Sequence, residues 1–289
     1  MTDRDLWRPG AATRLAAVLG HPVGHSLSPA MHNAAFRALR LDWVYLAFDV
    51  APGAVEGAVA GMRALGIEGF SVTIPHKEAM ARAVDVLSPL AESLGAVNTV
   101  VRDAAGRLRG ENTDGPGFLR SLRDDEGFDP QGRRCLVVGA GGAARAVVRA
   151  LADAGAAEVV VAGRTRARVE AVAALAGDCG RVGVPEDAGE ADLVVNATPL
   201  GMAGTDAAGQ LPVDPSHLGP GQVVVDLVPN PAIPPLVEAA RARGAVAVNG
   251  LGMLVHQAAL AFRMWTGQDP PLGAMSAAAL AELKARTDG

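Results

Sequence analysis

Short apolar runs alternate with stretches of helical periodicity along most of this chain. Segments 30–39, 52–65, 145–155 and 231–243 have the spacing of helices that bury one face. The apolar runs that precede or follow them have the length of strands, and they cover residues 14–20, 42–50, 69–74, 135–138, 159–162, 191–195, 222–226 and 245–248. Such alternation predicts an α/β fold with parallel sheets, in which ligands bind at the carboxyl ends of the strands.

Two features refine this picture. Residues 97–101 and 107–110 have the pattern of a hairpin around a turn at Gly106. At the far end, an amphipathic helix is expected over 250–266 and a last helix up to residue 285. We predict that these two helices pack back on the first domain. The expected substrate-binding catalytic domain is therefore 1–114 completed by 250–289, and 115–249 forms a Rossmann-type domain, with a cleft between the two.

The segment 133–168 has the order strand, glycine turn, helix, strand. Its turn reads G-x-G-x-x-A, from Gly139 through Gly141 to Ala144. In this motif the first glycine permits a tight bend, the second lets the backbone approach a pyrophosphate, and the small third residue lets helix and strand pack closely. The amides at the start of the new helix then face the anion. The context predicts dinucleotide binding.

The end of the second strand indicates which dinucleotide is bound. A site for NAD usually has an acidic residue there, which binds the ribose 2′-hydroxyl. This chain instead has Gly163-Arg164-Thr165-Arg166-Ala167-Arg168. A guanidinium can hold a 2′-phosphate with two hydrogen bonds. The pattern therefore favours NADP, although Arg166 also fits a solvated start of the next helix.

Composition narrows the classes of function. The chain has 289 residues, a net charge of −5 and 49% hydrophobic residues, which suits two domains with packed cores. Nucleic acid or an anionic membrane is an unexpected partner at this charge. The two cysteines, Cys135 and Cys179, have no metal-binding spacing and suggest no disulfide. We therefore expect no metal site, and we expect a monomer or homodimer. The N-terminus is charged rather than signal-like, which favours a cytoplasmic location.

Lys77 is conspicuous because almost all basic residues are arginine; the only other lysine is Lys284. Lysine can give up its proton when its pKa is lowered, whereas arginine cannot. Lys77 follows the strand at 69–74, where ligands are expected, and we interpret His76 as its surface neighbour. Ser28, before Pro29, fits either a helix N-cap or a ligand contact.

Taken together, the motifs resemble those of the shikimate dehydrogenase family over nearly the full chain. The matching segments are GHPVGHSLSP (20–29), SVTIPHK (71–77), GAVNT (95–99), ENTDG (111–115), GAGGAARA (139–146), NATPLGM (196–202) and GLGMLVHQAA (250–259). The resemblance implies a two-domain α/β enzyme that interconverts 3-dehydroshikimate and shikimate with NADP. This reaction is a step of aromatic amino-acid biosynthesis, on the route to chorismate.

The resemblance also implies a role for each matching position. It makes Lys77 and Asp114 the catalytic pair at the C3 oxygen, although Asp114 alone would fit an ordinary turn or N-cap. Ser26 and Ser28 are expected to bind the substrate carboxylate. The ring is expected to contact Ser71, Thr73, Asn98 and Gln257. The cofactor is expected on Gly139, Ala140, Gly141, Gly142, Ala143, Gly163, Arg164, Thr165, Arg168, Thr198, Val228 and Gly250.

Three positions depart from the family pattern. Pro229 stands where a tyrosine commonly reaches the substrate, and Ser71 stands where many members have asparagine. Gly163 replaces the asparagine that commonly precedes the clamp arginine. Pro229 and Ser71 keep open the alternative of a paralogue that acts on quinate or an amino analogue, with NAD as an alternative cofactor. An alternative of another class is a non-catalytic NADP-binding sensor, against which the intact Lys77 and Asp114 argue.

Overall fold

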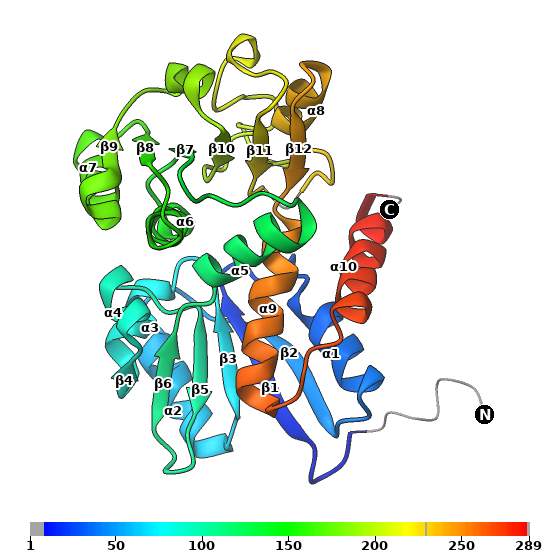
Figure 1. Cartoon of the computed structure of the whole chain (residues 1–289). Helices are drawn as coiled ribbons and strands as arrows, with labels where there is room; N and C mark the ends of the chain where they lie inside the picture. Colours follow the sequence, from blue (N-terminus) through cyan, green and yellow to red (C-terminus); the bar gives the residue numbers. More distant parts are fainter. Residues whose placement is uncertain (1–8, 229, 288–289) are drawn as a thin grey trace. The chain divides into compact units, whose positions relative to one another are not determined.

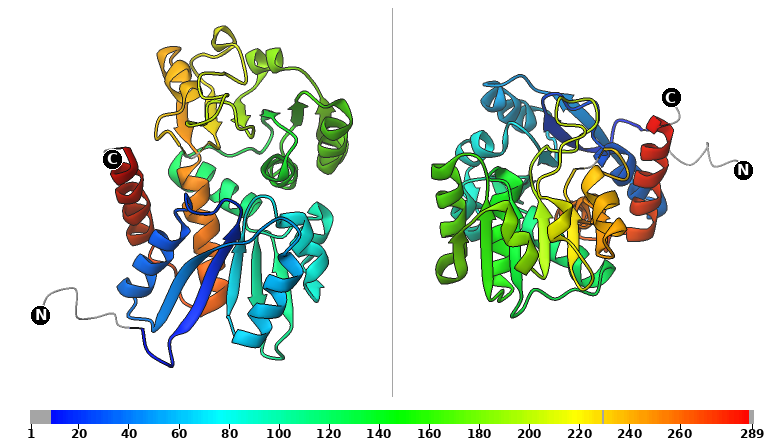
Figure 2. Two further views of the ribbon diagram at one scale, coloured as in Figure 1. Left: turned by 180° about the vertical axis from the view of Figure 1, so that it is seen from behind. Right: turned by 90° about the horizontal axis from the view of Figure 1, so that it is seen from above.

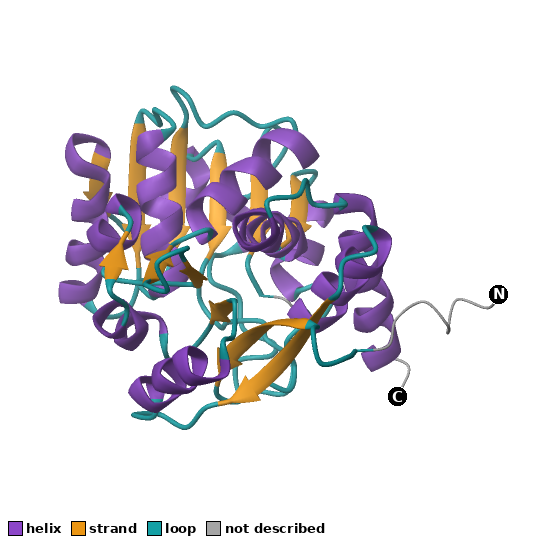
Figure 3. Cartoon of the chain, turned by 90° about the horizontal axis from the view of Figure 1, so that it is seen from below, coloured by secondary structure: helices purple, strands orange, loops and turns teal. Residues whose placement is uncertain are grey.

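The computed structural model describes residues 9–228 and 230–287, which form two compact units (Figure 1). Unit 1 comprises Met1–Thr113 and Val255–Gly289, and unit 2 comprises Asp114–Leu254. Each unit contains one six-stranded sheet, and Figure 3 distinguishes the strands from the helices that flank them. The predicted α/β class is confirmed. No helix in the described part of the chain is both long enough and apolar enough to cross a membrane.

The sheet of unit 1 has the strand order β2-β1-β3-β5-β6-β4 and mixed direction. β1 pairs in parallel with β2 and β3, but β5 is antiparallel to both β3 and β6. The expected parallel arrangement is confirmed for β1, β2 and β3, as is the expected hairpin of β5 and β6. The antiparallel pairing of β5 with β3, which makes the sheet mixed, was not predicted. The strands are β1 (Arg14–Gly20), β2 (Trp43–Asp49), β3 (Gly69–Val72), β4 (Val86–Leu87), β5 (Thr99–Arg102) and β6 (Leu108–Glu111).

Helices cover both faces of this sheet (Figures 1 and 2). On one face, Val59 and Met62 of α2 pack against Leu19 and Phe70 of the strands. On the opposite face an aromatic cluster joins α1, β2 and α9. The helices of this unit are α1 (Ser28–Ala38), α2 (Val55–Leu65), α3 (Lys77–Ala83), α4 (Pro89–Leu94) and α10 (Leu272–Thr287), together with most of α9 (Leu251–Thr266).

α9 is anchored to the sheet of unit 1 by Trp265, whose side chain is only 6% exposed. The indole N–H donates to the carbonyl oxygen of Val100 at 3.0 Å. The ring also occupies the place of a side chain at Gly69, where a Cβ would lie 2.1 Å from Trp265 Nε1. Gly69 is thus required by close packing, and the contact sets the position of α9 along β3 and β5.

Unit 2 contains an all-parallel sheet with the order β12-β11-β10-β7-β8-β9. This is the arrangement of a Rossmann-type domain, and the strand order reverses between β7 and β10. The short strand β9, like β4 and α4 of unit 1, was not expected from the sequence. The strands are β7 (Arg134–Val138), β8 (Glu158–Ala162), β9 (Gly180–Val182), β10 (Leu193–Asn196), β11 (Val223–Asp226) and β12 (Val246–Asn249).

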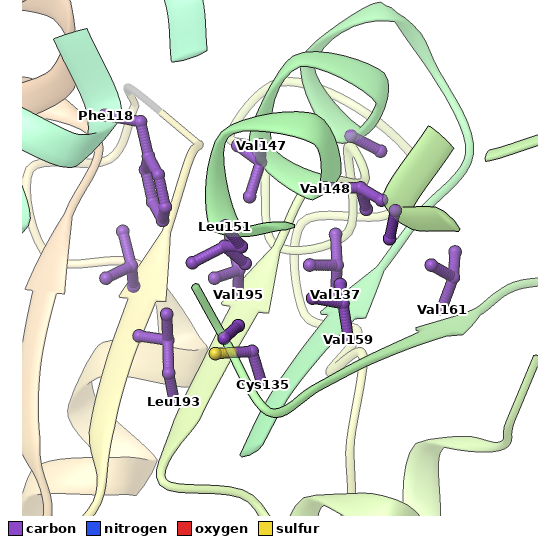
Figure 4. Close-up of a cluster of buried hydrophobic side chains, with 14 of the residues drawn as sticks. Phe118, Cys135, Val137, Val147, Val148, Leu151, Val159, Val161, Leu193 and Val195 are labelled. Carbon is purple, nitrogen blue, oxygen red and sulfur yellow. The ribbon is translucent and has the colours of Figure 1, made fainter. Parts of the chain in front are cut away.

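The central strands of unit 2 are buried on both faces, which explains their unbroken runs of valine. Figure 4 shows Val147 and Leu151 of α6 above the side chains of Val137 and Val195. The opposite face packs against α8 and the loops beside it. The helices are α5 (Asp114–Arg120), which continues as a π-helical turn (Ser121–Asp125), α6 (Gly142–Asp153), α7 (Arg166–Ala173) and α8 (Pro235–Ala242), with short 3₁₀ segments at Ala174–Cys179, Pro185–Glu190 and Pro215–His217.

Candidate active site

In unit 1 the predicted substrate residues gather at one edge of the sheet. This edge contains the ends of β1, β3 and β6 and, because β5 runs the other way, the start of β5. The backbone N–H of Val72 donates to the carbonyl oxygen of Asn98 at 2.7 Å. The N–H of Asn98 in turn donates to the carbonyl oxygen of Glu111 at 3.0 Å. The antiparallel pairing of β5 with β3 therefore brings Asn98 beside the end of β3.

Asn98 is the centre of a buried hydrogen-bond network. Its Oδ1 accepts from the backbone N–H of Thr113 at 2.7 Å and from Thr99 Oγ1 at 3.1 Å. Its Nδ2 donates to Thr113 Oγ1 at 2.9 Å. Gln257 of α9 joins through Oε1, which lies 3.5 Å from both Asn98 Nδ2 and Thr113 Oγ1. Sequence reasoning named Asn98 and Gln257 but missed Thr113, which stands next to Asp114 in the ENTDG motif.

Lys77 is the first residue of α3, directly after the turn that follows β3. Its backbone carbonyl accepts from the N–H of Val97 at 3.0 Å, which holds this helix start against the segment leading to Asn98. The Lys77 side chain is half-buried, as is that of Thr73, which lies at the same edge. The interpretation of His76 as a surface neighbour is wrong: it is 2% exposed, and its Nε2 lies 2.7 Å from the carbonyl oxygen of Val50.

Ser26 and Ser28 lie at the start of α1. Ser28 is 6% exposed and is the first helical residue, but no side chain caps this helix and the N-cap position is Leu27. The capping interpretation of the Ser28 hydroxyl is therefore wrong, because the helix begins one residue earlier than its side chain would require. Ser26 Oγ instead accepts from the backbone N–H of Ser28 at 3.2 Å.

Tyr45, the only tyrosine of the chain, lies beside the predicted substrate residues Ser28 and Ser71, and sequence reasoning missed it. Burial raises the pKa of its hydroxyl, and the hydroxyls of Ser71 and Ser28 oppose that rise. These two hydroxyls are its neighbours, although neither meets the full geometry of a hydrogen bond to the Tyr45 hydroxyl. The ring stacks on that of His32 with the centroids 4.3 Å apart. Ser28, Ser71 and Tyr45 thus form a cluster of buried hydroxyls; the single tyrosine in a chain poor in aromatics was the available signal.

Asp114 begins α5 in unit 2 and is 6% exposed. The helix lies against α6, since a Cβ at the next residue, Gly115, would be 2.9 Å from the carbonyl oxygen of Ala146. A carboxylate at this place also suits the positive end of the α5 dipole. The pairing of Asp114 with Lys77 stays a prediction.

The glycine turn of unit 2 has the shape of an anion cradle. Gly139 has φ = +128°, and a Cβ there would lie 2.7 Å from the carbonyl oxygen of Ala197. Gly141, by contrast, has no atom within 4 Å of its Cβ position, so the backbone is open to a ligand. α6 begins at Gly142 with no side-chain cap, which leaves its first amides available. These features fit the pyrophosphate of a dinucleotide.

The arginines that follow β8 differ in their contacts. Arg166 Nε donates to Glu170 Oε1 at 2.6 Å, one turn along α7, as expected of a solvated helix start. Arg164 and Arg168 are exposed and have no ion-pair partner among the residues described by the structure. Two guanidiniums without an acidic partner at this position fit a 2′-phosphate. Gly163 and Thr165 are exposed beside them.

The remaining predicted cofactor residues follow β10, β11 and β12. Thr198 Oγ1 donates to Asn196 Oδ1 at 2.6 Å, and the N–H of Val228 donates to Asp226 Oδ1 at 3.0 Å. At Gly250 a Cβ would lie 2.9 Å from the Cα of Leu227, so only glycine fits between these loops. Pro229, the departure noted above, lies outside the described residues.

Comparison with known proteins agrees with the family resemblance of the sequence motifs. Family models described as the shikimate dehydrogenase substrate-binding domain, shikimate/quinate 5-dehydrogenase and the shikimate 5′-dehydrogenase C-terminal domain match residues 18–100, 124–199 and 250–280. A shikimate dehydrogenase (NADP(+)) from Moorella thermoacetica is 49% identical over 275 residues, which cover 92% of each chain.

Solved structures show the same likeness. A shikimate dehydrogenase in complex with NADP⁺ has a TM-score of 0.90 at 37% identity, covering 96% of this chain and 98% of that one. A shikimate 5-dehydrogenase from Thermus thermophilus, in complex with NADP(H) and shikimate, has a TM-score of 0.86 at 42% identity over 93% of this chain and 99% of the other. The chain therefore belongs to the shikimate dehydrogenase family.

Proposed function

We propose that this protein is an NADP-dependent shikimate dehydrogenase, which reversibly reduces 3-dehydroshikimate to shikimate in aromatic amino-acid biosynthesis. The observation that carries the proposal is the buried polar network at the sheet edge of unit 1. Asn98, Thr113 and Gln257 combine amide and hydroxyl groups from three segments of the chain. Such groups both donate and accept hydrogen bonds, which is what a polyhydroxylated ring requires.

The hydroxyl cluster beside this network suits the carboxylate of the same substrate. Ser26 and Ser28 present hydroxyls that can donate to it, and Ser71 and Tyr45 add further hydroxyls beside Ser28; no acidic side chain is among these four. A carboxylate only accepts hydrogen bonds, so a group of donors without a competing acid favours its binding. The predicted contact from Thr73 completes the substrate residues of unit 1.

Lys77 is the proposed acid. Hydride transfer to a carbonyl carbon leaves a developing alkoxide, which an ammonium group within hydrogen-bond reach stabilises and protonates. In the reverse direction the neutral amine accepts the proton. A carboxylate near Lys77 would orient the amine, and Asp114 is the proposed group.

The cofactor supplies the hydride, and unit 2 supplies its binding residues. The glycine turn from Gly139 to Ala143 would bind the pyrophosphate, and Arg164 and Arg168 would bind the 2′-phosphate. Thr198, Val228 and Gly250 are proposed to line the nicotinamide end. Gly163 and Thr165 would support the adenosine half.

The test is a panel of steady-state rates with shikimate or quinate as substrate and NADP⁺ or NAD⁺ as cofactor. Reduction of the cofactor is followed by the absorbance of the reduced nicotinamide. We expect shikimate with NADP⁺ to be the best combination. Preference for quinate would favour the paralogue, which Ser71 already suggests as a second candidate. Binding of NADP⁺ without turnover on any substrate would favour the sensor.

Lys77→Ala tests the chemistry in the same assay. We expect kcat to fall by about a hundredfold or more while the KM for shikimate changes little, in line with the usual contribution of an acid or base. Lys284→Ala, which removes the only other lysine from the exposed side of α10, is the matched control and should leave both constants unchanged. Near-normal turnover in Lys77→Ala would remove this residue from the mechanism.

We also propose that the protein is cytoplasmic and a monomer or homodimer.

A further inference from the structure

A buried acid that the proposed reaction does not use lies in unit 2. Asp226 is the last residue of β11 and is fully buried. In the parallel ladder it stands in register with Asn196 of β10 on one side and Asn249 of β12 on the other. The carboxyl ends of these strands are the edge at which Rossmann-type sheets bind their ligands.

The contacts of Asp226 satisfy only half of its carboxyl group. Oδ1 accepts from Asn196 Nδ2 at 2.9 Å and from the N–H of Val228 at 3.0 Å. Oδ2 is buried and has no partner among the described residues. Asn249 does not reach it, since its side chain bonds to Ala232 and to the backbone of Leu251. The carboxyl group is thus held firmly in place but is not neutralised.

Hydrogen bonds connect Asp226 with the proposed cofactor loops. Asn196 Oδ1 accepts from both the N–H and the hydroxyl of Thr198, at 3.0 and 2.6 Å. Thr198 lies against the glycine turn, because a Cβ at Gly139 would be 3.3 Å from Thr198 Cγ2. The acid therefore belongs to the rigid frame behind the loops that contain Thr198 and Val228, both proposed to line the nicotinamide.

The ionised form of Asp226 prevails only above the raised pKa that its burial produces. Burial raises its pKa to about 6, and the hydrogen bonds from Val228 and Asn196 oppose the rise. The neighbouring strands present asparagine on both sides, and no charged group of the described residues contributes to the shift. An ionised carboxylate without a counter-ion produces a field that a buried site screens weakly.

We propose that the Asp226 carboxylate makes unit 2 bind the oxidised cofactor in preference to the reduced one. This inference rests on the proposed function, specifically on the nicotinamide lying beside Thr198 and Val228. The oxidised nicotinamide ring carries a positive charge and the reduced ring carries none, so a fixed negative charge stabilises only the oxidised form. The two charges would be separated by the length of one or two side chains. At an effective dielectric constant of about 20, their attraction changes the affinity for the oxidised form relative to the reduced form on the order of tenfold.

The experiment measures the dissociation constants of NADP⁺ and NADPH by calorimetric titration, without substrate. Asp226→Asn keeps the shape and the acceptor oxygen but removes the charge. We expect the ratio of the NADPH constant to the NADP⁺ constant to fall about tenfold in this variant. The matched control is Asp153→Asn, which removes one charge from the last turn of α6, at the opposite end of that helix from the glycine turn. This control should keep the ratio of the unsubstituted protein.

A pH series on the unsubstituted protein provides a second measurement, independent of how well the variant folds. The ratio should fall between about pH 8 and pH 5, as Asp226 becomes protonated, and in Asp226→Asn it should stay at its low-pH value throughout. Titration of the 2′-phosphate, whose pKa is also about 6, cancels because both forms carry this group.

Three results would overturn the inference. An unchanged ratio in Asp226→Asn, with both forms bound tightly, would overturn it and leave the proposed function intact. An equal loss of affinity for both forms would also overturn it, because Asp226 would then only support the fold of the loops. If the unsubstituted protein binds neither form, the proposed function itself fails and the inference fails with it.

Discussion

Replacement of Gly69 by alanine should strongly destabilise unit 1. A Cβ at this position would lie 2.1 Å from Trp265 Nε1 and 2.4 Å from its Cδ1, whereas carbon atoms pack at about 3.5–4.0 Å. The indole must therefore move by more than about 1 Å, although it is buried and bonded to Val100. Overpacking costs about 1–3 kcal/mol, and a buried indole N–H left without a partner costs about as much again. We expect a loss of roughly 3–5 kcal/mol.

The assay is equilibrium unfolding in urea, with Gly61→Ala as the matched control. Gly61 lies within α2 of the same unit and has no atom within 4 Å of its Cβ position. Alanine there should stabilise the helix by about 0.5–1 kcal/mol, so the two substitutions should have opposite signs. Trp265→Phe in the Gly69→Ala background should be less harmful than the sum of the single changes. Equal stability of the two glycine variants would refute the packing described for Trp265.

Two further predictions concern charge. Arg164→Ala and Arg168→Ala should each weaken NADP⁺ binding about tenfold or more and leave NAD⁺ binding nearly unchanged. Arg166→Ala should alter neither, because this guanidinium is already paired with Glu170. Equal losses for all three arginines in a binding titration would contradict a specific clamp. Burial lowers the pKa of His32 to about 3, below its ordinary value of 6.5. Between these two pH values protons bind preferentially to the unfolded chain. The free energy of unfolding should therefore fall by roughly 1.4 kcal/mol per pH unit as the pH drops from about 6.5 to 4. His32→Phe should reduce that slope in urea unfolding at several pH values, and an unaltered slope would show that this ring is not the group excluded from protonation.

Local signals predicted most of the secondary structure. The strand over 14–20 and the helix ending at residue 65 agree with β1 and α2 at these boundaries, because apolar periodicity reflects which face an element buries. The segment β4–α4 was missed, since a strand of two residues and a helix of six leave no periodic pattern. The hairpin fixed the direction of β5 relative to β6 only, so the antiparallel pairing of β5 with β3 could not be predicted from it.

The sequence by itself determined the parts of this protein whose cause is local. Gly139 and the arginines after β8 could be recognised because their roles depend on backbone freedom and charge within a few consecutive residues. Only the tertiary structure decided that Asn98, Thr113 and Gln257 share one network, since Gln257 is 159 residues from Asn98 along the chain. It also decided that His32, Tyr45, His76 and Asp226 are buried. Burial depends on what distant segments place around a side chain, and no pattern of neighbouring residues contains that information.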